Sequence, residues 1–350
     1  MLPKHTLRLS AASRQLSHSI ATQPTPQTRP YTTSSTTPQY PPSNRLKGRS
    51  CMITGGTSGI GYAIAARFLQ EGIDQVILVG RSHARLVSAA TTLSSGTATE
   101  PSALPPTSSP PETAAKHTLL PFSQTISLLV GDVAEASSWS RELEKVMQTT
   151  NLTHLINAAG LSISSVLTKS SPEDIARILD TNLQGAILTT RAFLRAAMRN
   201  HVRSKRTPGA AAPAPGSKGV GDGENPGANQ PPPSKCIINI ASLLAHKGGT
   251  GAVTYAASKA GILGLTRSVA VEAGAAMRDV RVRSNAIVPG YVETPMIEDF
   301  SEGETARLKQ SIPLGRFGLP HEVADAALFL AQNEYANNCV LNLDGGLSAV

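Results

Sequence analysis

Two side chains capable of proton chemistry stand four residues apart in "TYAASKAGILGL", residues 254–265. Residues i and i+4 of a helix lie one turn apart on the same face, so the phenol of Tyr255 and the ammonium group of Lys259 can share one small volume. A free tyrosine has a pKa of about 10, and a nearby ammonium group favours the tyrosinate. The same spacing also occurs on solvated helix surfaces. The pair therefore predicts a catalytic acid only if other motifs converge on it.

Short apolar segments alternate with helix-length segments from residue 50 onward. The strand candidates are 51–54, 75–79, 125–130, 153–157, 235–240, 280–288 and 339–343, and the helix candidates lie near 60–71, 137–149, 173–180, 183–200, 254–277 and 320–332. Continuously apolar strands separated by helices are typical of a parallel sheet covered on both faces. The sequence predicts an α/β fold: a single doubly wound, Rossmann-type domain over residues 47–350, with a seven-stranded parallel sheet.

Two stretches interrupt this alternation, at about 88–122 and 204–234. Both are rich in Pro, Gly, Ser and Ala and show no apolar period. Such a composition buries too little surface to offset the entropy lost on ordering, so we predict two disordered insertions. A domain boundary is the alternative for each, but the apolar alternation resumes after both.

The net charge of +8 resides almost entirely in the first 50 residues. That segment holds seven basic residues and no acidic one, which leaves 25 basic against 24 acidic residues in the rest of the chain. The predicted domain is therefore nearly neutral and offers no basic footprint for nucleic acid. Residues 1–46 are rich in Arg, Ser and Thr and free of acids, which is typical of a mitochondrial transit peptide and predicts a matrix protein. An ordinary basic tail is the alternative.

Neither a membrane span nor a metal site is expected from the sequence. No apolar run approaches the roughly 18 to 20 residues that cross a bilayer. The three cysteines, Cys51, Cys236 and Cys339, lie far apart in apolar runs. We therefore expect them to be buried small hydrophobic residues rather than disulfide partners or zinc ligands.

A glycine-rich turn, "TGGTSGIG" at 54–61, follows the first strand candidate and precedes a helix candidate. Gly55, Gly59 and Gly61 permit a tight turn and a close backbone approach to a pyrophosphate at the helix N-terminus. Glycine loops also simply make turns. Here strand, turn, helix and second strand come in the order of a dinucleotide site, so we predict cofactor contacts along this turn: Gly55, Thr57, Ser58, Gly59, Ile60 and Gly61.

The second strand candidate ends at Gly80-Arg81-Ser82. An acidic residue at this point accepts hydrogen bonds from the ribose 2′-OH of NAD, whereas an arginine pairs with the 2′-phosphate of NADP. Arg81 stands here without an adjacent acid, which predicts NADPH/NADP+ as the cofactor. The alternative is a solvated arginine that merely follows a strand.

Seven motifs carry a resemblance to a known family. They are "TGGTSGIG", "GDV" at 131–133, "NAAG" at 157–160, Asn182 in "TNLQG", Ser242 in "IINIASLLA", Tyr255-x-x-x-Lys259, and "PGYVETPM" at 289–296. In order and spacing the chain resembles the short-chain dehydrogenases/reductases over about residues 48–348, apart from the two insertions. The resemblance implies that Tyr255 donates the proton to a ketone, Ser242 holds the carbonyl, Lys259 also binds the nicotinamide ribose, and Asn182 completes a water-linked relay.

The same resemblance implies the remaining cofactor contacts. Asp132 and Val133 would flank the adenine, and Asn157, Ala158 and Gly160 would lie along the cofactor, with Pro289, Gly290, Val292 and Thr294 toward the nicotinamide and diphosphate. The polar segment 293–312 is expected to be a mobile substrate lid. Members of the family assemble as tetramers, which implies a homo- or hetero-tetramer built through the helices near 183–200 and 254–277 and the strand near 339–343.

The substrate expectation rests on "IPLGRFGLPHEVADAALFLAQNE" and the surroundings of Tyr255, which resemble the 3-oxoacyl-[acyl-carrier-protein] reductases. This implies reduction of a carrier-linked 3-oxoacyl group in mitochondrial fatty-acid synthesis, with basic residues such as Arg195 and Arg278 docking the acidic carrier. Ser284 and the two insertions depart from the family pattern. Two alternatives stay open: an NADPH-dependent reductase of a free small-molecule ketone (a polyol, steroid or secondary metabolite), and a noncatalytic NADPH-binding subunit.

Overall fold

A computed structural model describes residues 43–95, 118–206 and 234–350. Most of the predicted transit segment (1–42) and the interiors of the two predicted insertions (96–117 and 207–233) lie outside the described residues. Within the described part, eight strands form one sheet in the order β3-β4-β2-β1-β5-β6-β7-β8. The strands are β1 Ser50–Thr54, β2 Gln75–Gly80, β3 Leu119–Pro121, β4 Ile126–Val130, β5 His154–Asn157, β6 Lys235–Ile240, β7 Val282–Pro289 and β8 Val340–Leu343.

Seven of these strands pair in parallel, as predicted, and β3 is an eighth strand that the sequence did not indicate. It pairs antiparallel with β4, with Leu119 opposite Leu129. Three residues are too few to show an alternating pattern, and Pro121 is compatible only with an edge position because it lacks a backbone donor. The predicted doubly wound fold is confirmed, with one short antiparallel strand added at its edge.

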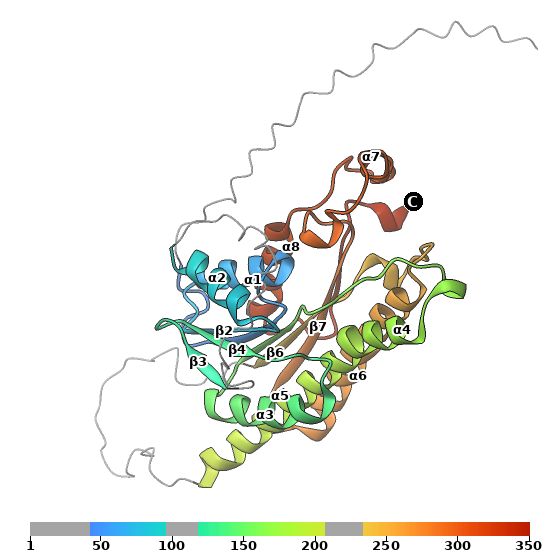
Figure 1. Ribbon diagram of the computed structural model, residues 1–350. Coiled ribbons are helices and arrows are strands. Elements are labelled where there is room, and N and C mark those ends of the chain that lie inside the picture. Colours follow the sequence, from blue (N-terminus) through green and yellow to red (C-terminus); the bar gives the residue numbers. More distant parts are fainter. Residues whose placement is uncertain (1–42, 96–117, 207–233) are drawn as a thin grey trace, which may run out of the picture. The chain divides into compact units, whose positions relative to one another are not determined.

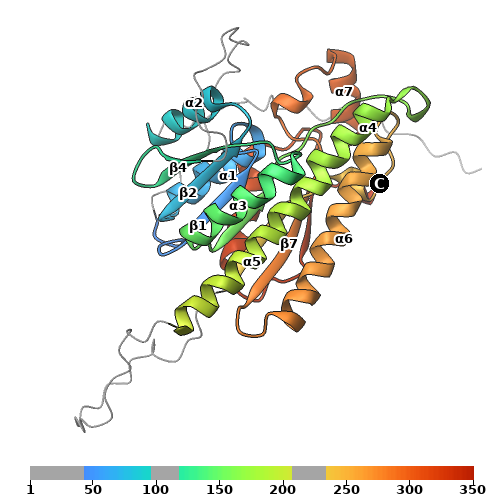
Figure 2. The ribbon, with the colours of Figure 1, turned by 60° about the horizontal axis from the view of Figure 1, so that its bottom comes forward.

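Helices cover both faces of the sheet (Figure 1). Their bounds are α1 Gly59–Gln70, α2 His83–Ser94, α3 Ala136–Thr150, α4 Pro172–Leu179, α5 Gly185–Arg206, α6 Val253–Ala276, α7 Glu302–Ser311 and α8 Pro320–Gln332. One face carries α1, α2 and α8; Figure 2 shows α3, α5 and α6 running side by side over the other. Short helical turns lie between these elements: η1 Leu167–Lys169, η2 Asp180–Gln184, η3 Leu243–Ala245, η4 Pro295–Ile297 and η5 Leu347–Ala349.

The continuously apolar strands contribute side chains to two separate apolar cores. In β1, Cys51 and Ile53 belong to the core beneath α1 and α8, while Met52 faces the core beneath α3 and α5. Both sides of each central strand are therefore buried, which explains the absence of a polar alternation. Cys51 and Cys236 are buried free thiols, as expected, whereas Cys339 is a free thiol that is only partly buried.

Helix α2 and the end of α5 occupy residues that we predicted to lie in insertions. Helix α2 continues to Ser94 and α5 to Arg206, so the predicted boundaries at 88 and 204 are wrong. Helix α2 contributes only small or isolated apolar side chains, Leu86, Ala89 and Ala90, to the core. Such a Ser-, Thr- and Ala-rich helix has a composition close to that of a linker, and for this reason the pattern concealed it.

The folded domain begins earlier than the predicted boundary at residue 47. The backbone N–H of Ser43 donates to Gln70 O (3.0 Å) and that of Leu46 to Glu71 O (2.8 Å). Leu46 is 1% exposed, and the Arg45 guanidinium pairs with the fully buried Glu71 carboxylate. Residues 43–46 therefore belong to the fold. A single apolar residue in this stretch gives no periodic signal, so the sequence did not reveal it.

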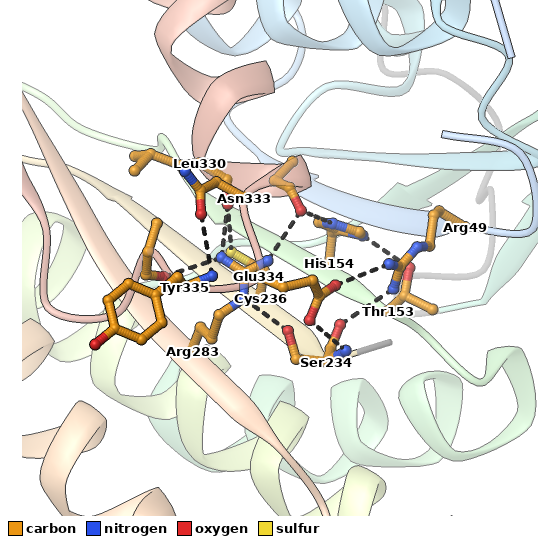
Figure 3. A network of polar contacts seen from close by, with 12 residues as sticks. Arg49, Thr153, His154, Ser234, Cys236, Arg283, Leu330, Asn333, Glu334 and Tyr335 are labelled. Carbon is orange, nitrogen blue, oxygen red and sulfur yellow. Dashed lines mark hydrogen bonds and ion pairs between the residues drawn. The ribbon is translucent and has the colours of Figure 1, made fainter. Parts of the chain in front are cut away.

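The amino-terminal edge of the sheet is held by a polar network around Ser234, the residue before β6 (Figure 3). The Arg283 guanidinium donates to Ser234 Oγ (2.6 Å) and to main-chain carbonyls near the C-terminal end of α8 (2.7–3.0 Å). The Ser234 N–H donates to Glu334 Oε2 (2.9 Å), and Arg49 bonds both Ser234 O and Glu334. A cation at a helix C-terminus complements its dipole, so this network fixes β6 and α8 together.

No helix in the described ranges is long and apolar enough to cross a membrane. The same ranges contain no group of three or more His, Cys, Asp or Glu residues arranged to hold a metal ion.

Candidate active site

The predicted site residues come from loops that follow the carboxyl ends of parallel strands. The glycine turn follows β1, Arg81 follows β2, Asp132 follows β4, Gly160 follows β5 and Ser242 follows β6. Carboxyl ends of parallel strands meet at one edge of a sheet, which is where open α/β folds bind ligands. The fold thus brings segments almost 200 residues apart in the chain to a common edge.

The glycines after β1 are required by close backbone contacts. Gly55 has φ +71°, and a Cβ there would lie 2.8 Å from the Ala159 main chain. A Cβ at Gly61 would overlap the Gly55 carbonyl, 2.9 Å from its carbon. Helix α1 begins at Gly59 after the N-cap Ser58, so unpaired N–H groups of its first turn are available beside the turn. The turn can hold a pyrophosphate, while the Ile60 side chain packs against the apolar core.

Two charged residues, Arg81 and Asp132, lie after β2 and β4 at this edge. Arg81 Nη1 is 3.9 Å from Asp132 Oδ2, and the Arg81 side chain is 68% exposed. Thr57 Cγ2 is 3.0 Å from the Cβ position of Gly80, so the turn reaches the end of β2. Val133, by contrast, is buried and its Cβ would be 2.9 Å from a side chain at Gly185. Arg81 is therefore free to meet a phosphate, whereas the Val133 side chain serves the packing of α5.

The "NAAG" motif after β5 is anchored by a residue that the sequence argument did not single out. Thr54 Oγ1 accepts hydrogen bonds from the N–H groups of Ala158 and Ala159, both at 3.2 Å. The Asn157 amide points instead into the helix layer, where it donates to Asn239 Oδ1 (2.8 Å) and Thr190 Oγ1 (3.1 Å). The Asn157 side chain thus faces the helix layer, because successive strand side chains face opposite sides, and a contact between this residue and a cofactor stays a prediction.

Ser242 and Tyr255 are brought together across two elements. Ser242 follows β6 and caps η3, with its Oγ accepting from Leu244 N (3.2 Å). Tyr255 lies on the first turn of α6, close enough to the Ser242 side chain for that hydroxyl to lower the Tyr255 pKa. A hydroxyl pair of this kind can bind one carbonyl oxygen from two sides.

Lys259 lies one turn further along α6 and is nearly fully buried. Its Nζ donates to Ile240 O (2.9 Å) and is 5.7 Å from the centre of the Tyr255 ring. Burial lowers the pKa of Lys259 to about 8. Burial also raises the pKa of Tyr255, against the opposing effect of the hydrogen bond from Ser242. Desolvation of the phenolate therefore dominates the Tyr255 pKa among the protein's own groups.

Asn182 lies in η2, a π-helical turn between α4 and α5. Its Oδ1 accepts from Leu161 N (2.8 Å), and its Nδ2 donates to Leu161 O (3.0 Å) and Ser258 Oγ (3.1 Å). A Cβ at Gly160 would lie 3.4 Å from Lys259 Nζ and 3.5 Å from Asn182 Oδ1. Asn182, Gly160 and Lys259 thus share one small volume. The Asn182 side chain holds the Leu161 backbone, and its part in a water-linked relay stays a prediction.

The segment after β7 closes the site over the glycine turn. Thr294 carbon atoms lie 3.2–3.3 Å from the Cβ position of Gly59. Val292 is buried and forms a β-bridge with Gly318, and a Cβ at Gly290 would lie 2.8 Å from Asp344 Cα. Pro289, the last residue of β7, is also buried. The predicted lid, 293–312, contains helix α7, which the sequence did not indicate because Leu308 is its one buried side chain.

The two candidate docking arginines are not placed as predicted. Arg195 Nε is 3.2 Å from Glu144 Oε1 of α3, so its charge is already paired. Arg278 follows the C-terminal end of α6, roughly 35 Å along the helix axis from Tyr255 at 1.5 Å per residue. Because α6 runs antiparallel to the strands, its C-terminal end lies at the amino-terminal edge of the sheet. Arg278 therefore lies far from the candidate site.

Comparison with protein families and known proteins agrees with this geometry. Residues 50–202 match the family model described as KR domain, and residues 228–348 match the one described as enoyl-(acyl carrier protein) reductase. The chain is 31% identical over 306 residues to 3-oxoacyl-[acyl-carrier-protein] reductase FabG of Thermotoga maritima, covering 87% of this chain and 99% of that protein. It is 30% identical over 297 residues to the 3-oxoacyl-[acyl-carrier-protein] reductase of Bos taurus, covering 85% and 97% of the two chains.

A solved structure has the same fold. It is described as an NAD(P)-dependent gluconate 5-dehydrogenase from Beutenbergia cavernae with bound NADP at low occupancy. The TM-score is 0.66 at 25% identity, with 89% of this chain and all of that chain covered. The ordered motifs, the glycine turn, the Ser242–Tyr255–Lys259 arrangement and these relatives lead to one conclusion: the chain belongs to the short-chain dehydrogenase/reductase family of oxidoreductases.

Proposed function

We propose that the chain is an NADPH-dependent ketoreductase that acts on a 3-oxoacyl group carried by an acyl carrier protein. The observation that carries the proposal is the meeting of Ser242, Tyr255 and Lys259 at the carboxyl edge of the sheet, beside the glycine turn. The chemistry supplied by bound NADPH is hydride donation to the carbonyl carbon. The protein's own side chains supply the proton and hold the oxygen that receives it.

In this mechanism Tyr255 acts as the acid. A raised pKa keeps its phenol protonated at neutral pH, which is the form needed to donate a proton during ketone reduction. Ser242 donates a hydrogen bond to the carbonyl oxygen from the opposite side and holds it against the phenol. Lys259, with a pKa of about 8, is mostly cationic at neutral pH and stabilises the tyrosinate that forms after transfer. Asn182 keeps the Gly160–Leu161 backbone in place beside the Lys259 ammonium group.

The cofactor cradle fits NADPH. The backbone at Gly55 and Gly61 leaves no room for a Cβ, so a pyrophosphate can approach the main chain closely at the start of α1. Arg81 is largely exposed and stands at the end of β2, where it can pair with a 2′-phosphate. Asp132 is close enough to orient the Arg81 guanidinium without burying it.

The acyl part of the substrate is supported by two exposed apolar residues near Tyr255. Val166 and Leu167 are 43% and 52% exposed on the segment after β5. That segment is joined to the start of α6 by a hydrogen bond from Ser165 N to Gly251 O (3.0 Å). An acyl chain can bury such side chains, whereas a polyol gains nothing from them. The names of the relatives from Thermotoga maritima and Bos taurus support the carrier-linked form.

The experiment compares acetoacetyl-carrier protein with a panel of free ketones and with a 2-enoyl-carrier protein, each with NADPH. Turnover of acetoacetyl-carrier protein is expected. If only free ketones are turned over, the proposed acyl substrate is wrong and the substrate is a small ketone. If NADPH binds without any turnover, the chain is a noncatalytic subunit. Tyr255→Phe is expected to abolish reduction while NADPH affinity stays within about twofold of wild type. Retention of more than about a tenth of turnover would refute the role of Tyr255 as the acid.

Localisation and assembly complete the proposal. The acid-free, Arg-rich start of the chain supports a mitochondrial matrix enzyme, and processing must leave Ser43–Leu46 in place because those residues are part of the fold. Exposed apolar side chains on α5 and α6, namely Ile187, Met198 and Val271, support a tetramer. Mass spectrometry of the mature N-terminus from isolated mitochondria and light scattering of the purified protein test these two points. A mature chain that starts after residue 46, or a monomer, would overturn them.

A further inference from the structure

The turn after β8, Asp344–Ala349, contacts three parts of the candidate site at once; we name it the β8 turn. On one side Asp344 packs against Gly290, the residue after β7, whose N–H donates to Leu343 O (2.9 Å). On another, Gly345 O accepts from Leu314 N (3.2 Å), just beyond the end of α7. On the third, Leu347 O accepts from Lys247 Nζ (3.2 Å), in the loop that carries Ser242.

The β8 turn has a fixed shape. The Asp344 carboxylate accepts from the N–H groups of Gly346 (2.9 Å) and Ser348 (3.0 Å), which closes the turn on itself. Gly345 and Gly346 have φ of +63° and +91°, values that side chains rarely adopt. A Cβ at Gly345 would lie 2.6 Å from the Ile312 side chain, so the turn presses directly on the segment after α7. It can therefore transmit a displacement rather than absorb it.

An apolar cluster joins the β8 turn to the serine loop and to the lid. Leu347 is buried together with Leu243, Leu308, Ile312 and Phe317. Leu243 immediately follows Ser242, and Leu308 is the buried residue of α7. A close-packed cluster resists partial displacement, so a change in α7 and the position of Ser242 are linked through Leu347.

We propose that Leu347 and Lys247 are positioning residues, which hold Ser242 against Tyr255 and couple its placement to helix α7. This inference rests on the proposed ketone reduction. Neither residue touches the reacting atoms: Leu347 acts through Leu243, and Lys247 acts by tying the serine loop to the β8 turn. A substrate that contacts α7 would thereby also influence where the Ser242 hydroxyl lies.

Leu347→Ala tests the role of the cluster. We expect kcat for ketone reduction to fall about 10- to 100-fold, because a misplaced Ser242 hydroxyl slows the chemical step. NADPH affinity should stay within about twofold of wild type, since the glycine turn is untouched. The isotope effect on kcat, measured with NADPH deuterated at the transferred position, should rise as chemistry becomes rate-limiting. Leu347→Met, which preserves volume, should restore most of kcat.

A matched control separates positioning from loss of folded protein. Leu143→Ala removes an equally buried leucine from the core beneath α3 and should lower stability without moving kcat per folded enzyme or the isotope effect. Lys247→Met should reproduce part of the Leu347→Ala loss, and Lys247→Arg, which keeps a donor, should restore it.

The outcomes distinguish this inference from the proposed function. If the wild-type protein reduces no ketone, the proposed function fails and the inference fails with it. If the wild type is active and Leu347→Ala retains its kcat and isotope effect, the inference alone is overturned. It is overturned as well if Leu347→Ala and Leu143→Ala lose activity equally with unchanged isotope effects, because Leu347 then only fills a core.

Discussion

Replacing Gly61 by alanine tests whether the turn after β1 is a cofactor cradle. The added Cβ would lie 2.9 Å from the Gly55 carbonyl carbon, whereas carbon atoms separated by contact distance lie about 3.5–4.0 Å apart. The backbone must therefore move by roughly 0.6–1 Å, and both contacting groups belong to the main chain, which has no rotamer to change. Overpacking of this kind costs about 1–3 kcal/mol.

That free energy is divided between folding and cofactor binding. If the whole cost appears as weaker binding of the pyrophosphate, the NADPH dissociation constant rises about 5- to 150-fold, since about 1.4 kcal/mol corresponds to a factor of ten. Fluorescence titration with NADPH measures this part. Urea unfolding without cofactor measures the part that reduces stability.

Gly274→Ala is the matched control for this prediction. Gly274 lies in α6 and has nothing within 4 Å of its Cβ position. The substitution should stabilise the protein by about 0.5–1 kcal/mol and leave NADPH affinity unchanged. If Gly61→Ala keeps both wild-type NADPH affinity and wild-type stability, the reasoning is refuted, because the overlap with Gly55 must reduce one of the two.

Three further predictions concern the cofactor and the start of the fold. Arg81→Ala should weaken NADPH binding and leave NADH binding nearly unchanged in parallel titrations; an unchanged NADPH dissociation constant would remove Arg81 from the 2′-phosphate site. Leu46→Ala should lower the free energy of unfolding in urea by about 2–5 kcal/mol, and a loss below about 0.5 kcal/mol would place residues 43–46 outside the cooperative unit. Burial raises the pKa of Glu71, but hydrogen bonds from Arg45 and Ser43 outweigh it and hold that pKa below its usual value. A lowered folded pKa stabilises above the unfolded pKa of about 4.3 and loses this effect as pH falls through the folded pKa. Arg45→Ala should therefore destabilise the protein more at pH 7 than at pH 3 in urea titrations, and an equal loss at both would exclude the ion pair as its cause.

The sequence predicted those parts of the site that local pattern encodes. The spacing of Gly55, Gly59 and Gly61 after a strand candidate is enough to indicate the turn, and Tyr255 and Lys259 share a face by helical spacing alone. The long-range partners could not be found in this way. Thr54 bonds the backbone of Ala158, 104 residues later, and Leu347 shares a cluster with Leu243 only because β6 and β8 flank β7.

The errors at element boundaries also have physical causes. Helix α2 was missed because its fully buried residues are one leucine and two alanines, and the start of the domain was missed because one leucine gives no period. The effect of burial on the Tyr255 pKa could not be foreseen, because charge can be read from a sequence, whereas desolvation depends on the final packing. Arg195 looked free for the same reason, since its partner Glu144 lies on another helix.

The network around Ser234 (Figure 3) gives the protein a permissive point for domain insertion. Lys205, near the end of helix α5, pairs with Asp279, and Ser234, the residue before β6, is hydrogen-bonded to Arg283 and Glu334. Both anchors lie at the amino-terminal edge, and the reacting groups lie at the carboxyl edge. A reporter protein spliced between residues 206 and 234 would thus be attached through two fixed points and kept a full strand length from the chemistry.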